Sequence, residues 1–474
     1  MNTILLIVII YLAAMILIGF FYRKKASQDG ESFLVANRSM GPRLGGGALA
    51  STYASTSSFL GTLGAMYAFG VAFGLWQNAG VIIGFTLATV FIAPKFRNYG
   101  SLSFSQFFEM RYNKKVRFVS AIVTVVAMFV YIMAQLQGGA YAIQYVLGID
   151  YWVGVLVIGA VFILYVVLGG SHSSIMASFI QFIMMAVAMI TVAIVVINAE
   201  PWGSTTTQAL QNQPLMFELK GENGLLYAIS CFVMMTLGAM SAPYVYLMYM
   251  FTKSNKVAQT TSALATTYLS IFYFVLLLVG VFIISNFPNL ENPDMGYFHT
   301  LDLLPTVIAG IFVAAVLAAA MSSTDAMLLN ATSAITNDIY SILAGKTLPN
   351  HVVVFVNRIV AVVIGVIAIL VTLKPPELIL LVMALAQSLM IGAFLVPLVL
   401  GLWWKKATSK GALAGMIGGF AVAVIAQFIP LPTPFIGGPL GALTSLILVI
   451  TISNRERKNM DMNLEDNQSL AKSQ

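Results

Sequence analysis

Charged residues are scarce in this chain, at 9% of 474 residues, whereas 59% are hydrophobic. The mean hydropathy of +0.91 excludes an ordinary soluble domain and indicates a protein that crosses a bilayer several times. The one cysteine, Cys231, excludes an internal disulfide and a site built from several thiolates. The three histidines are far apart, and no phosphate-binding Gly-Lys-Ser/Thr loop occurs. Because no nucleophile and base are grouped either, we do not expect an enzyme or direct use of ATP.

Thirteen apolar stretches each approach the roughly 20 residues that a helix needs to cross a bilayer. They lie at 2–22, 43–66, 70–93, 116–137, 152–170, 174–197, 224–250, 262–286, 303–333, 352–373, 378–402, 411–428 and 435–453. No Lys or Arg precedes the first stretch, which continues to Phe21, so we interpret it as a spanning helix and not as a cleaved signal. The predicted fold class is therefore an all-α membrane protein with about 13 transmembrane helices.

The distribution of positive charge predicts an orientation. If the N-terminus lies outside, only Lys220 and Lys374 of the 24 basic residues fall in outer segments. By the positive-inside rule, this predicts a multi-pass protein of the cell membrane with an outer N-terminus and a cytoplasmic C-terminus. The net charge of +7 then reflects topology and contact with anionic lipid, and it gives no reason to expect a nucleic-acid partner. The polar tail at 454–474 is expected to be disordered in the cytoplasm.

Four consecutive polar side chains interrupt the ninth stretch: Ser322, Ser323, Thr324 and Asp325. A carboxylate at the bilayer centre costs about 2.5–3.5 kcal/mol, and adjacent hydroxyls in hydrocarbon need partners. A polar site inside a helix bundle explains this run, and so do hydroxyls that bond back to their own helix. Asp325 is interpreted either as a protonatable coupling group or as a hydrated residue of the cytoplasmic half.

The second stretch is poor in bulky side chains, since residues 45–61 read GGGALASTYASTSSFLG. Close helix packing through small residues is one explanation. A broken helix whose exposed carbonyls hold an ion is the other. Five stretches later, residues 238–244 read GAMSAPY, and Pro243 removes a backbone donor in the middle of the stretch. Two interruptions at corresponding positions favour a transporter built from inverted repeats.

The chain resembles the sodium/solute symporter family, and within it the sodium/pantothenate symporters. The motifs that carry the resemblance lie at 51–61, 314–323, 374–377, 394–404 and 410–413. The resemblance implies a five-plus-five inverted-repeat (LeuT-like) core at 43–402, with repeat one at 43–197 and repeat two at 224–402. A leading helix and cytoplasmic loop at 1–42 would precede the core, and two trailing helices at 403–453 would follow it.

Site residues follow from the same resemblance. It implies a sodium site between the second and ninth helices, formed by carbonyls of Ser51, Ala54 and Ala319 and hydroxyls of Ser322 and Ser323. Substrate would lie beside the ion, and the candidate contacts are Ser57, Ser58, Gln77, Ser241 and Tyr244. Each of these candidates is equally compatible with a polar contact between helices.

Two positions depart from the family pattern. Ser178 stands where many members carry an acid associated with sodium release or a second sodium, which favours one sodium per cycle. Tyr53 stands where proline-transporting members carry Asp, which disfavours proline as the substrate.

The sequence thus predicts a sodium-coupled symporter that imports a small organic solute, an anionic carboxylate such as pantothenate. Sodium is the coupling ion, and no other cofactor is expected. The alternatives are a symporter for a monocarboxylate or another solute, coupled to sodium or to protons, and a membrane protein that senses a ligand. The sequence leaves open whether a small membrane partner protein is needed.

Overall fold

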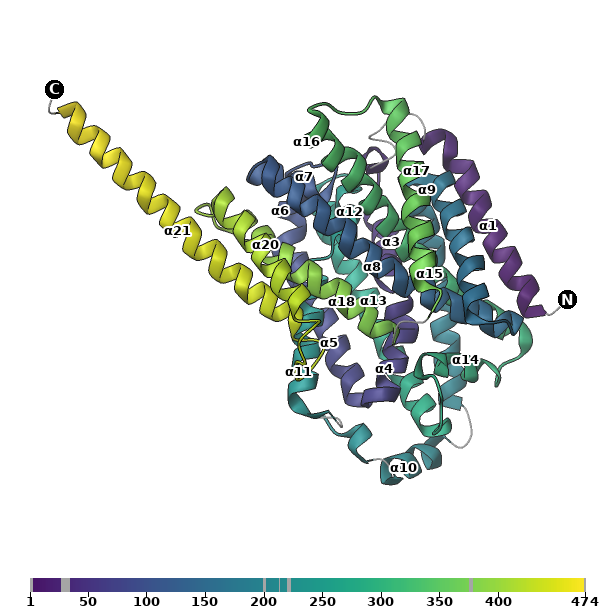
Figure 1. Ribbon diagram of the computed structural model, residues 1–474. Helices are drawn as coiled ribbons and strands as arrows, with labels where there is room; N and C mark the ends of the chain where they lie inside the picture. Colours follow the sequence, from purple (N-terminus) through teal and green to yellow (C-terminus); the bar gives the residue numbers. More distant parts are fainter. Residues whose placement is uncertain are drawn as a thin grey trace.

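The computed structural model describes residues 3–26, 35–198, 202–212, 214–219, 223–374 and 378–472. In these ranges the chain is almost entirely helical, and the one pair in a β-bridge is Met40 with Thr252. The helices pack side by side in a bundle, with α1 at one edge and α21 projecting from the other (Figure 1). The family-like motif at 374–377 lies mostly outside the described residues.

The α-helices follow one another through the whole chain. They are α1 (Thr3–Ala26), α3 (Pro42–Tyr53), α4 (Thr62–Phe69), α5 (Val71–Leu87), α6 (Ala93–Asn98), α7 (Phe104–Arg111), α8 (Lys114–Leu147), α9 (Tyr151–Asn198), α10 (Trp202–Asn212), α11 (Gly224–Ala239), α12 (Pro243–Met250), α13 (Asn255–Asn286), α14 (Gly296–Leu301), α15 (Thr306–Ser333), α16 (Tyr340–Ala344), α17 (Asn350–Thr372), α18 (Ile379–Met390), α19 (Val396–Trp403), α20 (Ser409–Ile425) and α21 (Gly437–Lys472).

Short helical segments of other types connect several of these helices. Four are π-helical: η2 (Ser57–Gly61), η3 (Ala88–Ile92), η6 (Ala334–Ile339) and η7 (Ile391–Leu395). Three are 3-10 turns: η1 (Ala36–Arg38), η4 (Pro214–Phe217) and η5 (Pro293–Met295). A π-helical insertion shifts the register of the helix that follows it, and such insertions are common at functional sites.

The hydropathy prediction of an all-α membrane protein is confirmed. Within the described residues, ten helical segments are long and apolar enough to cross a membrane. Two shorter apolar helices, Tyr151–Val167 and Ser409–Ile425, and the interrupted pair α3 and α4 match the remaining predicted stretches. The two stretches predicted at 152–170 and 174–197 share the single helix α9.

The C-terminal segment differs from the expectation of a disordered tail. The backbone of α21 continues as a helix to Lys472 and projects away from the bundle (Figure 1). Extending an existing helix avoids the unfavourable nucleation step, so a polar segment next to a membrane helix can remain helical.

Burial separates central helices from peripheral ones. In the most apolar window of Thr306–Ala344, which contains α15, 78% of residues are buried, compared with 22% for the N-terminal helix α1. The segment Ile379–Trp403, with α18 and α19, is buried still further, at 89%. Alanines at 314, 315 and 318–320 let neighbouring helices approach α15 closely. The polar residues of α15 therefore face protein.

Candidate functional site

Two helices are interrupted at the positions that the sequence predicts. Helix α3 ends at Tyr53, and Ala54 leaves the helical conformation with φ −71° and ψ 67°. Helix α11 ends at Ala239, and α12 begins at Pro243 after Ala242, which is extended with φ −77° and ψ 114°. Proline fits the first position of a helix because its missing N–H has no partner there. The end of α3 leaves carbonyl groups without donors from the next helical turn.

The serine pair of α15 reaches these carbonyls. The Ser322 hydroxyl donates to the Ser51 carbonyl at 2.9 Å and lies 3.1 Å from the Ala319 carbonyl of its own helix. The Ser323 hydroxyl donates to the Thr52 carbonyl at 2.8 Å. Thr324 behaves differently, since it donates at 2.7 Å to Ala320 one turn earlier in α15.

The predicted sodium-site residues therefore meet at the end of α3. Ser51, Ala319 and Ser322 are in direct contact, Ser323 contacts Thr52, and Ala54 is the residue at which α3 ends. All five predicted residues are at most 3% exposed. Neutral carbonyl and hydroxyl oxygens at a helix interruption suit a hard monovalent cation. The prediction omitted Thr52, whose carbonyl no side-chain pattern could indicate.

Asp325, one turn beyond Ser322 in α15, contacts α9. Its carboxylate is 2% exposed and lies beside Tyr165 and Ser174 of α9. Its Oδ2 atom and the hydroxyl of Ser178, also on α9, have no hydrogen-bond partner among the described residues. The seam between α9 and α15 is therefore polar, but none of these contacts joins it to Ser51.

A group of tyrosines lies where the two interruptions meet. The rings of Tyr53 and Tyr244 are 6.2 Å apart, and those of Tyr131 and Tyr244 are 5.5 Å apart. The Tyr273 hydroxyl lies 3.0 Å from Ser58 Oγ, to which it donates. These side chains come from α3, α8, α12 and α13, so four helices contribute to one position.

Gln387 of α18 completes this group, which we call the phenol–amide cluster: Tyr53, Tyr131, Tyr244, Tyr273 and Gln387. The amide of Gln387 lies beside the Tyr53 hydroxyl and against the C-terminal end of α11, where a Cβ atom on Gly238 would be 2.7 Å from Gln387 Oε1. The hydroxyls of Tyr53 and Tyr244 and both amide atoms of Gln387 are buried and form no well-aligned hydrogen bond among the described residues, although Tyr53 faces Gln387 and Tyr244 faces Tyr131. The cluster therefore offers several neutral donors and acceptors to a small solute.

The predicted substrate contacts are only partly brought together. Tyr244 belongs to the cluster, and Ser58 contacts it through Tyr273. Ser57 accepts from Gln135 at 3.4 Å, and Ser241 donates to the Gly238 carbonyl at 3.2 Å within the interruption. Gln77 of α5 donates to Thr62 at 2.7 Å, so its nearest described partner is on α4.

Sequence reasoning missed Tyr131, Tyr273 and Gln387 as candidates. Each is a polar residue within an apolar stretch, which is the signal that could have identified it. That signal does not show which polar residues lie close to one another, because the three residues come from separate helices that only the fold brings together.

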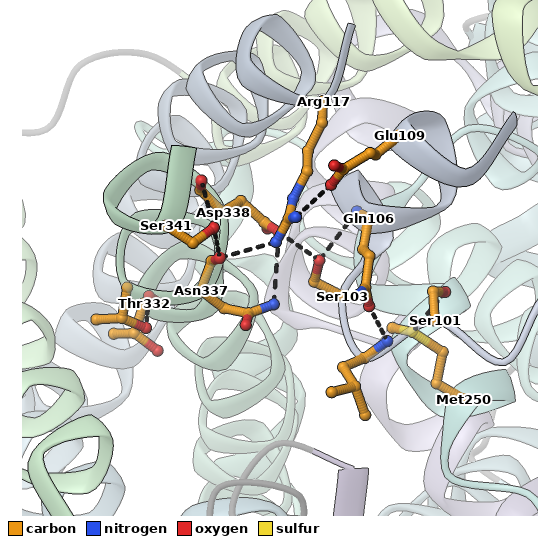
Figure 2. Close-up of polar contacts among 12 residues, drawn as sticks. Ser101, Ser103, Gln106, Glu109, Arg117, Met250, Thr332, Asn337, Asp338 and Ser341 are labelled. Atoms are coloured by element: carbon orange, nitrogen blue, oxygen red, sulfur yellow. Dashed lines mark hydrogen bonds and ion pairs between the residues drawn. The ribbon is translucent and has the colours of Figure 1, made fainter. Parts of the chain in front are cut away.

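A second polar network joins α7, α8 and η6 at one end of the bundle. Figure 2 shows Arg117, Glu109 and Asp338 pointing toward one another. Arg117 Nε donates to Asp338 Oδ1 at 2.8 Å, its Nη2 donates to the Asn337 carbonyl at 2.8 Å, and its Nη1 pairs with Glu109. The Ser103 hydroxyl donates to Asp338 at 2.7 Å. Arg117 is thus a buried ion-pair partner. From the sequence it was counted only among the basic residues that indicate topology.

A buried carboxylate also fixes the segment between α13 and α15. Asp294 Oδ2 accepts from the backbone N–H of Ile379, the first residue of α18, at 2.9 Å. Burial raises the pKa of Asp294 to about 7, and the hydrogen bond from Ile379 opposes this shift. A Cβ atom on Gly64 of α4 would lie 2.2 Å from Asp294 Oδ1, so only glycine fits there without movement. Asp294 therefore connects this segment to α4 and α18.

Comparison with proteins of known sequence identifies relatives along most of the chain. The family described as SSF: Sodium:solute symporter family matches residues 33–419. A sodium/pantothenate symporter of Escherichia coli (strain K12) is 29% identical over 436 residues, covering 89% of this chain and 90% of that protein. A sodium/proline symporter of Staphylococcus aureus (strain USA300 / TCH1516) is 27% identical over 439 residues, covering 89% and 85%.

Solved structures share the fold. A sodium-coupled sialic acid symporter in a substrate-bound outward-open state superposes with a TM-score of 0.80 at 19% identity, covering 95% of this chain and 98% of that one. The nucleobase-cation-symport-1 family transporter Mhp1, in a closed conformation, gives a TM-score of 0.57 at 14% identity, covering 89% and 94%. The predicted LeuT-like architecture is thereby confirmed. Since the family match covers most of its length, this chain belongs to the sodium:solute symporter family.

Proposed function

We propose that this protein is a sodium-coupled symporter that imports a small organic solute, an anionic carboxylate such as pantothenate. The observation that carries the proposal is the contact of Ser322 and Ser323 with the carbonyls of Ser51 and Thr52 where α3 ends. Oxygen atoms held in this way can replace the hydration shell of a cation without any change of protonation. The proposed ligands are those expected from the sequence, with the Thr52 carbonyl as a further candidate.

The phenol–amide cluster supports a solute position beside the ion. Its members carry no charge, so a carboxylate there would be stabilised by hydroxyl and amide donors, by the neighbouring sodium and by the N-terminus of α12. Tyr244 lies in the first turn of α12, and its ring contacts Tyr53 at the C-terminal end of α3. One solute can therefore contact both interrupted helices.

The suggestion of pantothenate comes from similarity to the Escherichia coli sodium/pantothenate symporter. The Staphylococcus aureus sodium/proline symporter is nearly as similar, so identity alone does not separate the two substrates. Tyr53 disfavours proline, because it stands where the resemblance places an Asp in proline transporters.

Binding of sodium would be linked to binding of solute through the arrangement of α3 and α15. An ion coordinated by α3 and α15 stabilises one arrangement of these helices, and solute bound at the end of α3 selects the same arrangement. Binding of each is then favoured by the other, as thermodynamic linkage requires.

Uptake by purified protein in proteoliposomes tests the proposal. The panel contains labelled pantothenate, short monocarboxylates and proline, each with an inward sodium gradient and with equal sodium on both sides. We expect pantothenate to accumulate only with the gradient. Accumulation of proline alone would overturn the proposal that the solute is an anionic carboxylate such as pantothenate. Solute binding without any uptake would favour a ligand sensor.

Proton coupling is the second candidate, and the buried carboxylate of Asp325 beside Tyr165 and Ser174 favours it. An imposed pH gradient without sodium would then drive uptake, and Asp325→Asn would abolish accumulation while exchange of solute continued. If sodium is the coupling ion, the pH gradient alone gives no accumulation.

A further inference from the structure

An apolar cavity of about 160 Å³ lies between α3, α9 and α13. Its wall includes Ala50 and Ala54 of the interrupted helix, Met185 and Met189 of α9, and Leu269 and Phe272 of α13. These six residues are all at most 8% exposed. Among the described residues that line the cavity none is charged, and every side chain is apolar except the phenol of Tyr268.

The cavity opens toward the outer surface of the bundle. Ile190 and Ile271, which also line it, are 55% and 57% exposed. The surface around them is apolar as well, since Val187, Ile194 and Phe274 are all more than half exposed. In a membrane protein such a surface contacts lipid.

The depth of the opening indicates which part of a lipid it meets. Ile271 lies near the middle of α13, about 20 Å or more from either helix end at 1.5 Å per residue. The hydrocarbon core is about 30 Å thick, so this position faces acyl chains and not head groups.

We infer that the cavity binds an acyl chain of a membrane lipid. Apolar cavities of roughly 150 Å³ exclude water and accept molecules such as benzene, so a cavity of this size and lining holds a comparable length of hydrocarbon. The occupant is hydrocarbon because the wall is apolar and the mouth opens into the hydrocarbon layer. This inference does not depend on which solute the protein transports.

The bound acyl chain would lie close to the ion-site residues, which gives the cavity a structural role. Met185 Sδ lies 3.9 Å from the hydroxyl of Ser51, whose carbonyl accepts the Ser322 hydroxyl. Ala54, where α3 ends, is part of the cavity wall. A bound acyl chain thus contacts α3 at the residues where the helix is interrupted.

Photochemical labelling in vesicles tests the inference. The probe is a phosphatidylcholine that carries a diazirine in the middle of one acyl chain, and adducts on the full-length protein are located by peptide mass spectrometry. We expect adducts on Met185 and Leu269, which are 2% and 1% exposed, in addition to the exposed residues Ile194 and Phe274. Labelling of the two buried residues requires an acyl chain inside the cavity.

Two variants separate filling of the cavity from labelling of the surface. Ala186 lines the cavity, so Ala186→Phe should abolish adducts on Met185 and Leu269 and leave those on Ile194 and Phe274 unchanged. The matched control, Val187→Phe, places the same side chain one residue away on the exposed face and should retain all adducts. If Ala186→Phe does not fold, Ala186→Leu fills less volume and should reduce the same adducts.

Three results would overturn the inference. The first is adducts confined to exposed residues in the parent protein. The second is undiminished labelling of Met185 in a folded Ala186 variant. The third is labelling of Met185 by a lipid whose diazirine is in the head group, which would indicate a polar occupant.

Discussion

The Nε atom of Arg117 donates to Oδ1 of Asp338 at 2.8 Å, joining α8 to the π-helical segment that follows α15 (Figure 2). The same helix α15 carries Ser322 and Ser323. A movement that separates α15 from α8 at this end must therefore break the ion pair or carry Arg117 along.

We expect Asp338→Asn to lower the melting temperature of the detergent-solubilised protein, because it leaves a buried guanidinium with only Glu109 as an ionic partner. Breaking a buried pair costs about 3–5 kcal/mol. The double variant Asp338→Asn/Arg117→Gln should lose less than the sum of the two single variants. Lys410→Gln is the control, since the Lys410–Glu456 pair has a lysine side chain that is 77% exposed and should contribute little. Strict additivity would show that the two buried side chains act independently.

The serine pair predicts a selective change in sodium dependence. Ser322→Ala or Ser323→Ala removes one of the proposed ligand oxygens, and the sodium concentration for half-maximal uptake should rise roughly 5- to 150-fold, which corresponds to about 1–3 kcal/mol. Thr324→Ala is the matched control, because this buried hydroxyl bonds to Ala320 of its own helix. Equal sodium dependence in the parent and both serine variants would rule out the assignment.

The phenol–amide cluster predicts a residue-specific effect on solute affinity. Tyr244→Phe removes a hydroxyl that faces Tyr131 without a well-aligned hydrogen bond, so stability should change little, while the KM for an anionic solute rises about 10- to 150-fold. Tyr297→Phe is the control, because its buried hydroxyl also has no described partner but its ring packs on Phe59 at 4.8 Å, outside the cluster. Identical uptake by both variants would place the solute elsewhere.

Asp294 predicts a pH dependence of stability. Burial raises the pKa of Asp294 to about 7 in the folded protein, above its ordinary value of 3.8, so the folded state binds the extra proton between these two values. The contribution of protonated Asp294 to the free energy of unfolding is fully present below about pH 4. It is lost as pH rises to about 7, by up to about 1.4 kcal/mol per pH unit.

Asp294→Asn keeps an oxygen that can accept from Ile379 and removes the titration. The melting temperature of this variant relative to the parent should therefore increase from pH 5 to pH 7 and then level off. A difference that is constant across this range would show that Asp294 does not titrate there.

Transport of a monoanion with one sodium should be electroneutral. The absence of an acid at Ser178 favours one sodium, and the phenol–amide cluster contributes no charge of its own. Moving one elementary charge across a membrane potential of about 100 mV changes the free energy by about 2.3 kcal/mol. The potential has no effect on the movement of a sodium ion together with a monoanion, because the pair carries no net charge. On a solid-supported membrane we expect a binding transient without sustained current, and a valinomycin-imposed potential should leave uptake unchanged. A sustained inward current would require at least two cations per cycle.

Hydropathy predicted the helices because backbone groups in hydrocarbon must form hydrogen bonds within the protein, and an α-helix forms them within its own stretch of sequence. The interruptions at Ala54 and Pro243 were predictable for the same reason, since glycine, serine and proline act on their own backbone. The tail was predicted incompletely, because polar composition does not reveal that a membrane helix continues into it.

Contacts between distant segments were not predictable to the same degree. Arg117 is one of many basic residues in the sequence, and only the packing of η6 against α8 brings Asp338 to it. Tyr131 and Gln387 lack any pattern that relates them to Tyr244, because their shared position depends on how three helices pack. Ser322 was found because hydroxyl groups in an apolar stretch need partners, although the sequence did not indicate the Thr52 carbonyl that Ser323 contacts.

The contact between Ser322 and Ser51 has a consequence for biosynthesis. The two residues are 271 positions apart, so at about 5–20 residues per second a ribosome makes the second roughly 15–50 s after the first. During that interval the carbonyls of Ser51 and Thr52 lack the hydroxyl partners that α15 supplies in the folded protein. The ion-site residues are thus brought together late in synthesis, and a chain that stalls before Ala319 would lack this contact even if its earlier helices were correctly inserted.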